Sequence, residues 1–253
     1  MERAETRRTP AATVSTSSGV EPSSAGSDVW TIVVGGGSGR RFGREKQYEV
    51  LDGRRVIDVS RDVAASCSDG VVVVVPTADA EREGGVAGGE TRSASVRAGL
   101  AAVPDSAVVI CVHDAARPLA TPEVYRRVVE AVRGGADAAI PAIAVSDTVK
   151  MIDRPVDVAL AGDGASGVVI STPERSRLVA VQTPQAFRAD SLRAAHRAGG
   201  DATDDAALVE AIGGSVVVVR GDPRNRKITE PDDLVWARRQ LAPSVPAGKD
   251  AVR

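Results

Sequence analysis

The chain has 253 residues, which suits one large α/β domain or two small ones, and its hydrophobic content of 43% is ample for a buried core. Its 32 basic and 34 acidic residues leave a net charge of −2, so there is no global field to hold DNA or an anionic membrane surface. Aromatic residues make up only 2%, too few for the stacking surfaces of single-strand binders. We therefore expect one domain, with neither nucleic acid nor a membrane as a partner.

The two ends of the chain differ in composition from the middle. Residues 1–28 are rich in Ser, Thr, Ala, Glu and Arg and contain no apolar run long enough for a signal peptide or a membrane span. They are expected to form a disordered leader, and residues 242–253 a disordered tail, which leaves 29–241 as the folded domain. Cys67 and Cys111 lie in or beside apolar stretches, so we interpret them as reduced thiols of a cytoplasmic protein.

The segment from residue 29 to residue 48 combines an apolar run, a glycine-rich turn and a group of cations. Ile32, Val33 and Val34 lead into Gly35, Gly36, Gly37, Ser38 and Gly39, after which come arginines and Lys46. Glycines can adopt φ > 0 and let backbone N–H groups approach an anion, while the cations can neutralise it, so the segment predicts a polyphosphate site. It matches neither G-x-G-x-x-G nor the Gly-Lys-Ser/Thr loop of nucleoside triphosphatases. A flexible turn beside solvated charges is the alternative interpretation of this segment alone.

Short apolar runs alternate with helical patterns along the rest of the domain. Four runs are almost wholly apolar: residues 71–75, 107–112, 138–140 and 215–219. Such runs are typical of strands buried on both faces of a parallel sheet. Apolar residues at helical spacing lie between them, with cap-like helix starts at Thr121, Thr203 and Thr229. The alternation predicts an α/β fold with a Rossmann-like, doubly wound, mostly parallel sheet.

Glycines or charged residues follow each expected strand. Beyond the glycine turn, these segments are residues 88–100, 113–118, 147–150 and 220–229. Ligands of open α/β sheets bind past the carboxyl ends of the strands. We therefore expect the four segments to converge on the glycine turn.

Seven segments resemble, in their order and approximate spacing, the 2-C-methyl-D-erythritol 4-phosphate cytidylyltransferase family. They are GGGSGRR with a following KQ, GGETRSASV, HDAARP, the Asp147-Thr148 pair, QTPQAF, ATDDA, and the N-x-K-[IV]-T pattern of residues 225–229. The resemblance covers essentially all of residues 29–241. One glycine loop is a weak signal, but seven segments in register are a strong one.

The resemblance implies a reaction that accounts for the many cations. A phosphate oxygen of methylerythritol phosphate attacks the α-phosphorus of CTP, and pyrophosphate leaves. Because the attacking phosphate is already anionic, the reaction needs charge neutralisation and alignment rather than a general base or a covalent nucleophile. The resemblance also implies Mg²⁺ on the triphosphate oxygens, with little direct ligation by the protein. CTP and a polyol phosphate are thus the expected small-molecule partners.

The resemblance also implies roles for individual residues. Arg41 and Lys46 match the pair that stabilises the charged state at the α-phosphorus, and Arg175 and Lys227 match the pair that holds the polyol phosphate for attack. Positions matched to the nucleotide-binding segments are Gly35, Gly36, Gly37, Gly39, Gly89, Glu90 and Ser95. Positions matched to other substrate contacts are Asp114, Arg117, Thr148 and Thr203. Taken singly, several of these residues have the alternative interpretation of a turn cap, a helix cap or a solvated charge, and His113 is assigned no role.

Residues 147–173 predict a protruding β-hairpin. Two stretches that alternate polar and apolar residues flank a segment, residues 153–167, that is rich in Pro, Gly, Asp and Ala. Because a lone two-stranded hairpin is only marginally stable in water, it needs a partner surface. In the family that the chain resembles, this arm embraces a second subunit, which implies a homodimer with Arg175 acting across it.

Two departures from the family pattern fall between Arg41 and Lys46. Glu45 stands where the family usually has proline, which would stiffen the loop, and the segment is slightly shorter than usual. Two alternatives stay open beside the methylerythritol phosphate enzyme. One is a sister cytidylyltransferase that acts on ribitol 5-phosphate and shares the fold and most motifs, although the alanines of HDAARP favour the first enzyme. The other, suggested by the altered loop at Glu45, is a relative that binds CTP without catalysis.

Overall fold

A mixed eight-stranded sheet forms the centre of the protein in the computed structural model, which describes residues 28–36, 42–154 and 167–241. Its order is β10-β7-β11-β6-β1-β4-β5, with β12 also paired to β7. The strands are β1 (Val29–Val34), β4 (Gly70–Val75), β5 (Val86–Ala87), β6 (Val109–Asp114), β7 (Ala138–Ala144), β10 (Val179–Val181), β11 (Gln185–Arg188) and β12 (Val216–Arg220). The pairs β1–β4, β1–β6, β4–β5 and β7–β12 are parallel, whereas β11 is antiparallel to β6 and β7 and β10 is antiparallel to β7. The predicted mostly parallel α/β sheet is confirmed.

The ends of the predicted strands shift, and three strands of the central sheet were not expected. β6 continues to Asp114 instead of ending at residue 112, because His113 and Asp114 still pair with Val33 and Val34 of β1. The pattern misses β5, β10 and β11, which have only two to four residues each and therefore show no clear periodicity.

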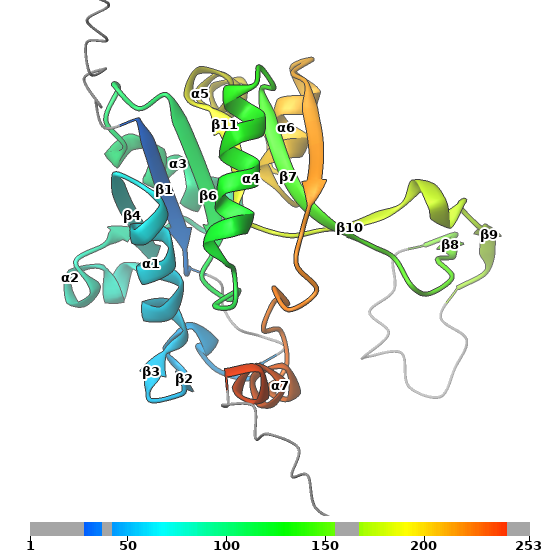
Figure 1. Ribbon diagram of the computed structural model, residues 1–253, viewed down its shortest axis with the longest axis horizontal. Helices are drawn as coiled ribbons and strands as arrows, with labels where there is room; N and C mark the ends of the chain where they lie inside the picture. Colours follow the sequence, from blue (N-terminus) through cyan, green and yellow to red (C-terminus); the bar gives the residue numbers. More distant parts are fainter. Residues whose placement is uncertain (1–27, 37–41, 155–166, 242–253) are drawn as a thin grey trace, which may run out of the picture.

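Helices cover both faces of the sheet (Figure 1). On one face lie α1 (Val56–Cys67) and α4 (Pro122–Arg133), and on the other lie α3 (Arg92–Ala102), α5 (Ala189–Ala198) and α6 (Asp205–Ala211). Ile32 of β1 packs into the core under α3 and α5, while its neighbour Val33 packs into the core under α1 and α4. This burial on both faces explains why the strands are continuously apolar.

Smaller elements lie around this body. They are η1 (Lys46–Tyr48), β2 (Val50–Leu51), β3 (Arg54–Arg55), η2 (Thr77–Asp79), α2 (Ala80–Glu83), η4 (Arg175–Arg177) and α7 (Pro231–Leu241). A third small core, which includes Phe42, Leu51 and Leu234, packs α7 beside β2. The last helix therefore packs against residues that lie on either side of Lys46 in the chain.

The helix starts refine the sequence prediction. Thr121 precedes Pro122 at the start of α4, as expected, but its side chain makes no capping hydrogen bond. Thr203 is not the cap of α6. Asp204 takes that place, because its Oδ1 accepts a hydrogen bond from the Ala207 N–H at 3.1 Å. Thr203 is thus an exposed residue one position before the cap.

The predicted hairpin is present as β8 (Met151–Ile152) and β9 (Val169–Ser171), which form a separate antiparallel sheet. This arm stands away from the body (Figure 1). Its Met151, Val169 and Ile170 side chains are more than half exposed, at 52%, 53% and 59%. The apolar arm therefore has no cover from the described part of its own chain, and the surface that it contacts stays a prediction.

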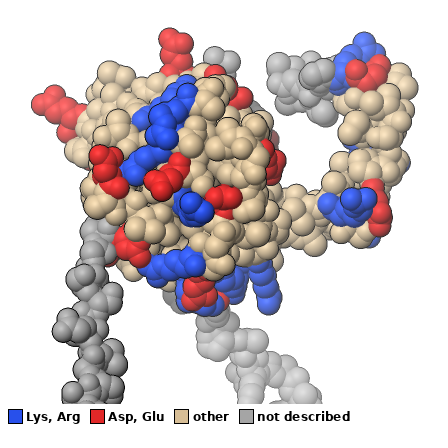
Figure 2. Space-filling view, turned by 90° about the horizontal axis from the view of Figure 1, so that it is seen from above, with Lys and Arg blue, Asp and Glu red and all other residues tan. Residues whose placement is uncertain are grey.

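The exterior carries charges of both signs. Lys and Arg lie interspersed with Asp and Glu on the face shown in Figure 2, without a large patch of one sign. Across the described residues, no helix is both long and apolar enough to cross a membrane. The expected leader, residues 1–28, and tail, residues 242–253, lie outside the described residues except for Asp28.

Candidate active site

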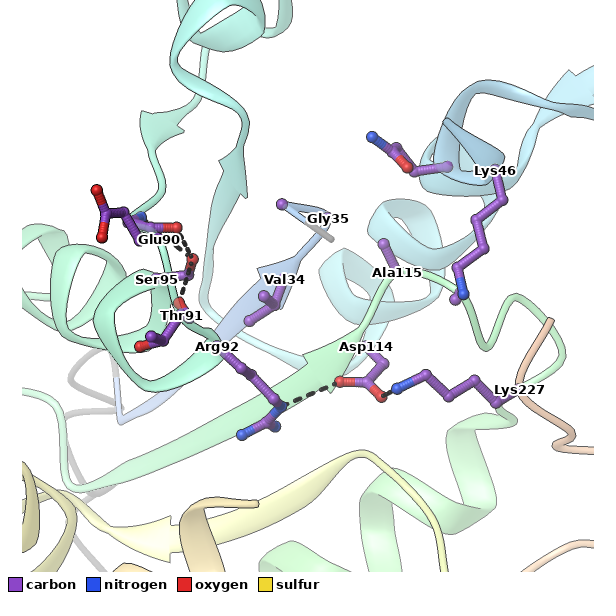
Figure 3. Close-up of a pocket in the computed structure, with 14 residues that line it drawn as sticks. Val34, Gly35, Lys46, Glu90, Thr91, Arg92, Ser95, Asp114, Ala115 and Lys227 are labelled. Atoms are coloured by element: carbon purple, nitrogen blue, oxygen red, sulfur yellow. Dashed lines mark hydrogen bonds and ion pairs between the residues drawn. The ribbon is translucent and has the colours of Figure 1, made fainter. Parts of the chain in front are cut away.

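A cavity of about 420 Å³ opens where β1 and β6 end, bounded by the start of α3 and by η1 (Figure 3). Its walls come from segments that are far apart in the sequence, as the sheet topology predicts. Eight residues expected from the sequence line it: Gly35, Gly36, Lys46, Gly89, Glu90, Ser95, Asp114 and Lys227. Both glycine turns, the end of β6 and Lys227 thus converge on one cavity, whereas residues 147–150, which were also expected there, do not line it.

The remaining expected residues are elsewhere. Gly37, Gly39 and Arg41 lie outside the described residues. Arg117 is largely buried behind the cavity, where it donates to the backbone carbonyls of Asn225 at 2.8 Å and Val181 at 3.3 Å. Thr148 lies on the arm, Arg175 lies in η4 beside the arm, and Thr203 lies in the loop before α6. None of these four lines the cavity of its own chain within the described part.

Of the two described glycines of the first turn, only Gly35 lies where an added side chain would be crowded. Gly35 donates its N–H to the Val74 carbonyl at 2.7 Å, and a Cβ there would lie 3.1 Å from Ile57 Cδ1. A Cβ on Gly36 would meet only Ser95 Oγ, at 3.5 Å. Neither glycine has a positive φ, so the left-handed backbone that the sequence suggested is not used at these two positions.

Ser95 fixes the second glycine turn. Its Oγ accepts from the Gly89 N–H at 3.2 Å and donates to the Thr91 carbonyl at 3.0 Å. A Cβ on Gly89 would approach Ala94 Cβ to 2.5 Å, so only glycine fits here. Thr91 caps α3 by accepting from the Ala94 N–H at 3.1 Å. The turn is therefore held rigidly against the opening of the helix.

Three charged side chains form a line at the floor of the cavity (Figure 3). Asp114 accepts a hydrogen bond from Lys227 Nζ at 2.6 Å through Oδ2, and its Oδ1 lies 3.6 Å from Arg92 Nε. Burial opposes ionisation of the carboxyl, but Lys227, Arg92 and Arg117 outweigh it, so the pKa of Asp114 lies below its ordinary value. Asp114 is therefore a carboxylate whose two oxygens both face cations.

Lys227 is held in place by contacts among distant motifs. Gln182 exchanges hydrogen bonds with the backbone of Asp222 at 2.9 and 3.1 Å, and Asn225 Nδ2 donates to the Thr183 carbonyl at 2.8 Å. The Ile228 N–H donates to the Ala116 carbonyl at 2.8 Å. The last motif is thus tied to QTPQ and to HDAARP on either side of Lys227.

Comparison with known proteins gives this geometry a family. The family model described as IspD: 2-C-methyl-D-erythritol 4-phosphate cytidylyltransferase matches residues 29–242. The chain belongs to this family. Two relatives named 2-C-methyl-D-erythritol 4-phosphate cytidylyltransferase are similar over most of their length. One, from Streptomyces avermitilis, is 40% identical over 241 residues, which cover 87% of this chain and 94% of the relative. The other, from Nocardia farcinica, is 42% identical over 227 residues, which cover 84% and 94%.

The fold agrees with that of a cytidylyltransferase of this family whose structure is solved. The crystal structure of 2-C-methyl-D-erythritol 4-phosphate cytidylyltransferase from Thermus thermophilus is similar with a TM-score of 0.68 and 32% sequence identity. The similarity covers 84% of this chain and 98% of that one. The family named from the seven segments is therefore confirmed.

Glu45, the departure from the family's proline, sits in a backbone that proline would accept. Its φ is −75°, which is within the range that a proline ring fixes, and it directly precedes η1. The side chain is exposed, and it does not contribute to the described cavity wall. In this cytidylyltransferase the glutamate charge therefore lies in solvent beside the site.

Sequence reasoning missed Arg92. Arg92 lies in the GGETRSASV segment that resembles the family. The sequence indicates no role for it, because its partners, Asp114 and Asp205, lie far along the chain. The only available signal was an arginine directly after a glycine turn at a helix start. Gln47, which is 3% exposed, also lines the cavity. In the sequence it stands out only as the residue that follows Lys46.

His113 is a structural residue next to the site. It is completely buried, its Nδ1 lies 3.1 Å from Thr183 Oγ1, and its ring lies 5.7 Å from that of Tyr125. Thr183 Oγ1 accepts the Asp114 N–H at 3.0 Å, so the hydroxyl hydrogen is free to point at Nδ1. Burial lowers the pKa of His113 to about 4. The ring is therefore neutral at physiological pH, in agreement with its having no assigned role.

The buried histidine predicts an acid-sensitive fold. The pKa of His113 falls from 6.5 in a free side chain to about 4 in the folded protein, so between these values the unfolded chain binds a proton that the folded chain does not. Stability should fall as the pH is lowered through this window, by about 3 kcal/mol in all. Urea unfolding between pH 7.5 and 4.5 measures the loss, and it should be smaller in His113→Asn. An NMR titration in which the His113 ring titrates near pH 6.5 would contradict the prediction.

Proposed function

We propose that this protein transfers CMP from CTP to 2-C-methyl-D-erythritol 4-phosphate, giving 4-diphosphocytidyl-2-C-methyl-D-erythritol and pyrophosphate. The observation that carries the proposal is one cavity in which two glycine turns meet Lys46, Lys227 and Asp114. Glycine turns and cations suit a nucleoside triphosphate, and a second cation suits an acceptor phosphate. The names of the relatives support this acceptor.

The proposed mechanism is in-line attack stabilised by fixed charges. Lys227, oriented by Asp114, holds the acceptor phosphate so that one of its oxygens faces the α-phosphorus of CTP. Lys46, together with Arg41, neutralises the charge that builds up at that phosphorus as the bond to pyrophosphate breaks. An acceptor phosphate is already an anion, so no side chain has to remove a proton from it. The lining suits this chemistry, because among the described lining residues there is no histidine.

The cavity suits a nucleotide that carries its own Mg²⁺. In the described residues, no group of three or more His, Cys, Asp or Glu side chains is placed to hold a metal ion. Asp114 lines the cavity, but both of its oxygens face cations. We therefore propose that the phosphate oxygens of CTP supply the ion's ligands, and the ion adds neutralising charge at the phosphates.

The test of the proposed function is pyrophosphate release from CTP and Mg²⁺ with two acceptors in parallel. Release with methylerythritol 4-phosphate and not with ribitol 5-phosphate is the expected result. Release only with ribitol 5-phosphate would keep the mechanism and change the acceptor. CTP binding without release in either assay would contradict catalysis and favour the non-catalytic relative.

We also propose that the protein is a cytoplasmic homodimer held by its arms. Arg175 lies in η4 beside the arm, exposed, and donates to the Ser146 carbonyl at 2.6 Å. Neither Arg175 nor Thr148 lines the cavity of its own chain. The apolar side chains of the arm are exposed in the described part of the chain. A second copy packed on the arm would cover those side chains and receive Arg175 at its own site. The free thiols Cys67 and Cys111 agree with a cytoplasmic location.

A charge on the arm should separate the subunits. Ile170 is 59% exposed on β9, so aspartate there costs little in a monomer but places a charge in the proposed interface. We expect Ile170→Asp to halve the mass found by sedimentation equilibrium and to lower activity at least about tenfold. Val108→Asp, at an equally exposed valine (59%) away from the arm, is the matched control. An unchanged mass for Ile170→Asp would contradict the proposed interface.

A further inference from the structure

The start of α3 holds the loop that precedes α6. Three hydrogen bonds join them: Thr91 Oγ1 to Asp201 Oδ1 at 2.7 Å, Arg92 Nη1 to Asp205 Oδ2 at 2.7 Å, and Ala202 N–H to Ser93 Oγ at 3.3 Å. Three successive residues of GGETRSASV thus bind Asp201, Ala202 and Asp205, of which the last two belong to the ATDDA segment. The first of these segments carries the glycine turn of the nucleotide side, and the second carries Thr203, matched to a substrate contact. The two sides of the proposed site are therefore physically connected.

Arg92 occupies the centre of this connection because it pairs with two buried carboxylates. Asp205 is fully buried and lies 2.7 Å from the guanidinium, and Asp114 lies 3.6 Å from it on the cavity side. Burial disfavours the charge on Arg92, but Asp205 and Asp114 outweigh it and raise its pKa. A buried carboxylate that loses its cation is costly, so each of the three groups fixes the position of the others.

A chain of polar contacts extends from the helix layer to the cavity. His196 Nε2 lies 3.0 Å from Asp205 Oδ1, Asp205 binds Arg92, Arg92 faces Asp114, and Asp114 binds Lys227. A lysine in place of Arg92 would keep the charge. It lacks the planar fork that reaches two carboxylates at once.

We propose that Arg92 is the positioning residue that aligns the nucleotide side and the acceptor side of the site. It holds Asp114 so that Lys227 points at the acceptor, and it holds Asp205 so that the loop with Thr203 stays against α3. The inference rests on the proposed function in one respect, the assignment of Lys227 and Thr203 to the acceptor. Arg92 acts on the acceptor only through these partners.

The loss of Arg92 should therefore affect the acceptor more than the nucleotide. Without Arg92, Asp114 is left with Lys227 as its close cation, so the lysine is neutralised and offers less charge to the acceptor phosphate. We expect Arg92→Gln to raise KM for methylerythritol 4-phosphate at least about tenfold while the Kd for CTP changes less than about threefold. Arg92→Lys should recover part of the loss, because it restores one of the two pairings.

A double-mutant cycle with Asp114→Asn tests whether Arg92 acts through Asp114. If it does, Arg92→Gln lowers kcat/KM by a smaller factor in the Asp114→Asn background than in the wild type, because the carboxylate that Arg92 orients is already neutral and only the path through Asp205 remains. If Arg92 contacts the substrate directly, the two effects multiply, and that result would overturn the proposal. Arg97→Gln is the matched control, since Arg97 also lies on α3 and contacts the same loop, at the Gly200 carbonyl (3.2 Å) and at Asp201 (3.8 Å), without reaching Asp114 or Asp205.

Amide hydrogen exchange gives a readout that does not depend on the reaction. Exchange at residues 203–205 should rise at least about tenfold in Arg92→Gln and less than about threefold in Arg97→Gln. Unchanged exchange in Arg92→Gln would overturn the proposal. If the wild-type protein is inactive with methylerythritol 4-phosphate while exchange responds as expected, the proposed function fails and the connection made by Arg92 stands. If Arg92→Gln does not fold, the pair Arg92→Gln with Asp205→Asn removes both buried charges together, and the same measurements apply to it.

Discussion

Lys46→Ala should lower kcat for pyrophosphate release about a thousandfold, because it removes a fixed positive charge from the place where negative charge builds up at the α-phosphorus. Lys46 lies at the start of η1, lines the cavity and is only partly buried. Its removal should leave the free energy of unfolding within about 0.5 kcal/mol of the wild-type value. Steady-state kinetics and urea unfolding of the same preparation check both expectations.

The control for this substitution is Lys249→Ala, the same exchange at a lysine in the C-terminal segment. It should leave kcat unchanged. A fall of less than about tenfold for Lys46→Ala would contradict the role given to Lys46 at the transition state. Glu45→Pro is a second variant to measure beside Lys46→Ala, because the φ of −75° at that position already suits proline.

Lys227→Ala should act mainly on the acceptor. We expect KM for methylerythritol 4-phosphate to rise about a hundredfold while the Kd for CTP changes little, because in the proposed mechanism Lys227 holds the acceptor phosphate and not the nucleotide. Kinetics at varied acceptor concentration and calorimetric titration with CTP separate the two effects. The neighbouring Arg226→Gln is the control, since Arg226 lies outside the cavity wall, over the Trp236 ring at 4.7 Å, and pairs with Asp233.

The same substitution should change how the protein responds to acid. The pKa of Asp114 is lowered in the folded state, so its pairing stabilises the protein above the ordinary pKa of 3.8 and is lost as the pH falls below it. Lys227 is the strongest influence that lowers this pKa against burial. Lys227→Ala should therefore show a smaller loss of stability on acidification below pH 4, as followed by urea unfolding. A loss as large as in the wild type would contradict the pairing.

Local spacing in the sequence predicted most of the sheet. Burial on both faces makes a strand apolar without interruption, so the runs that became β1, β4, β6 and β12 could be recognised. The antiparallel β11 had no such pattern, because only four residues of mixed character pair there between β6 and β7. Its place brings Thr183 against the end of β6, where the hydroxyl binds the Asp114 N–H.

By itself, the sequence determined the fold class, the glycine turns and the lysines of the site, because strand burial, tight turns and motif identity are properties of residues close together in the chain. Only the tertiary structure decided how the charges pair. Lys227 and Asp114 are 113 positions apart, as are Arg92 and Asp205. Such pairs depend on the order of strands in the sheet and on burial that makes an unpaired carboxylate costly, and neither quantity appears in local spacing. For this reason Arg92 emerged from the structure as the residue that connects the two sides of the site.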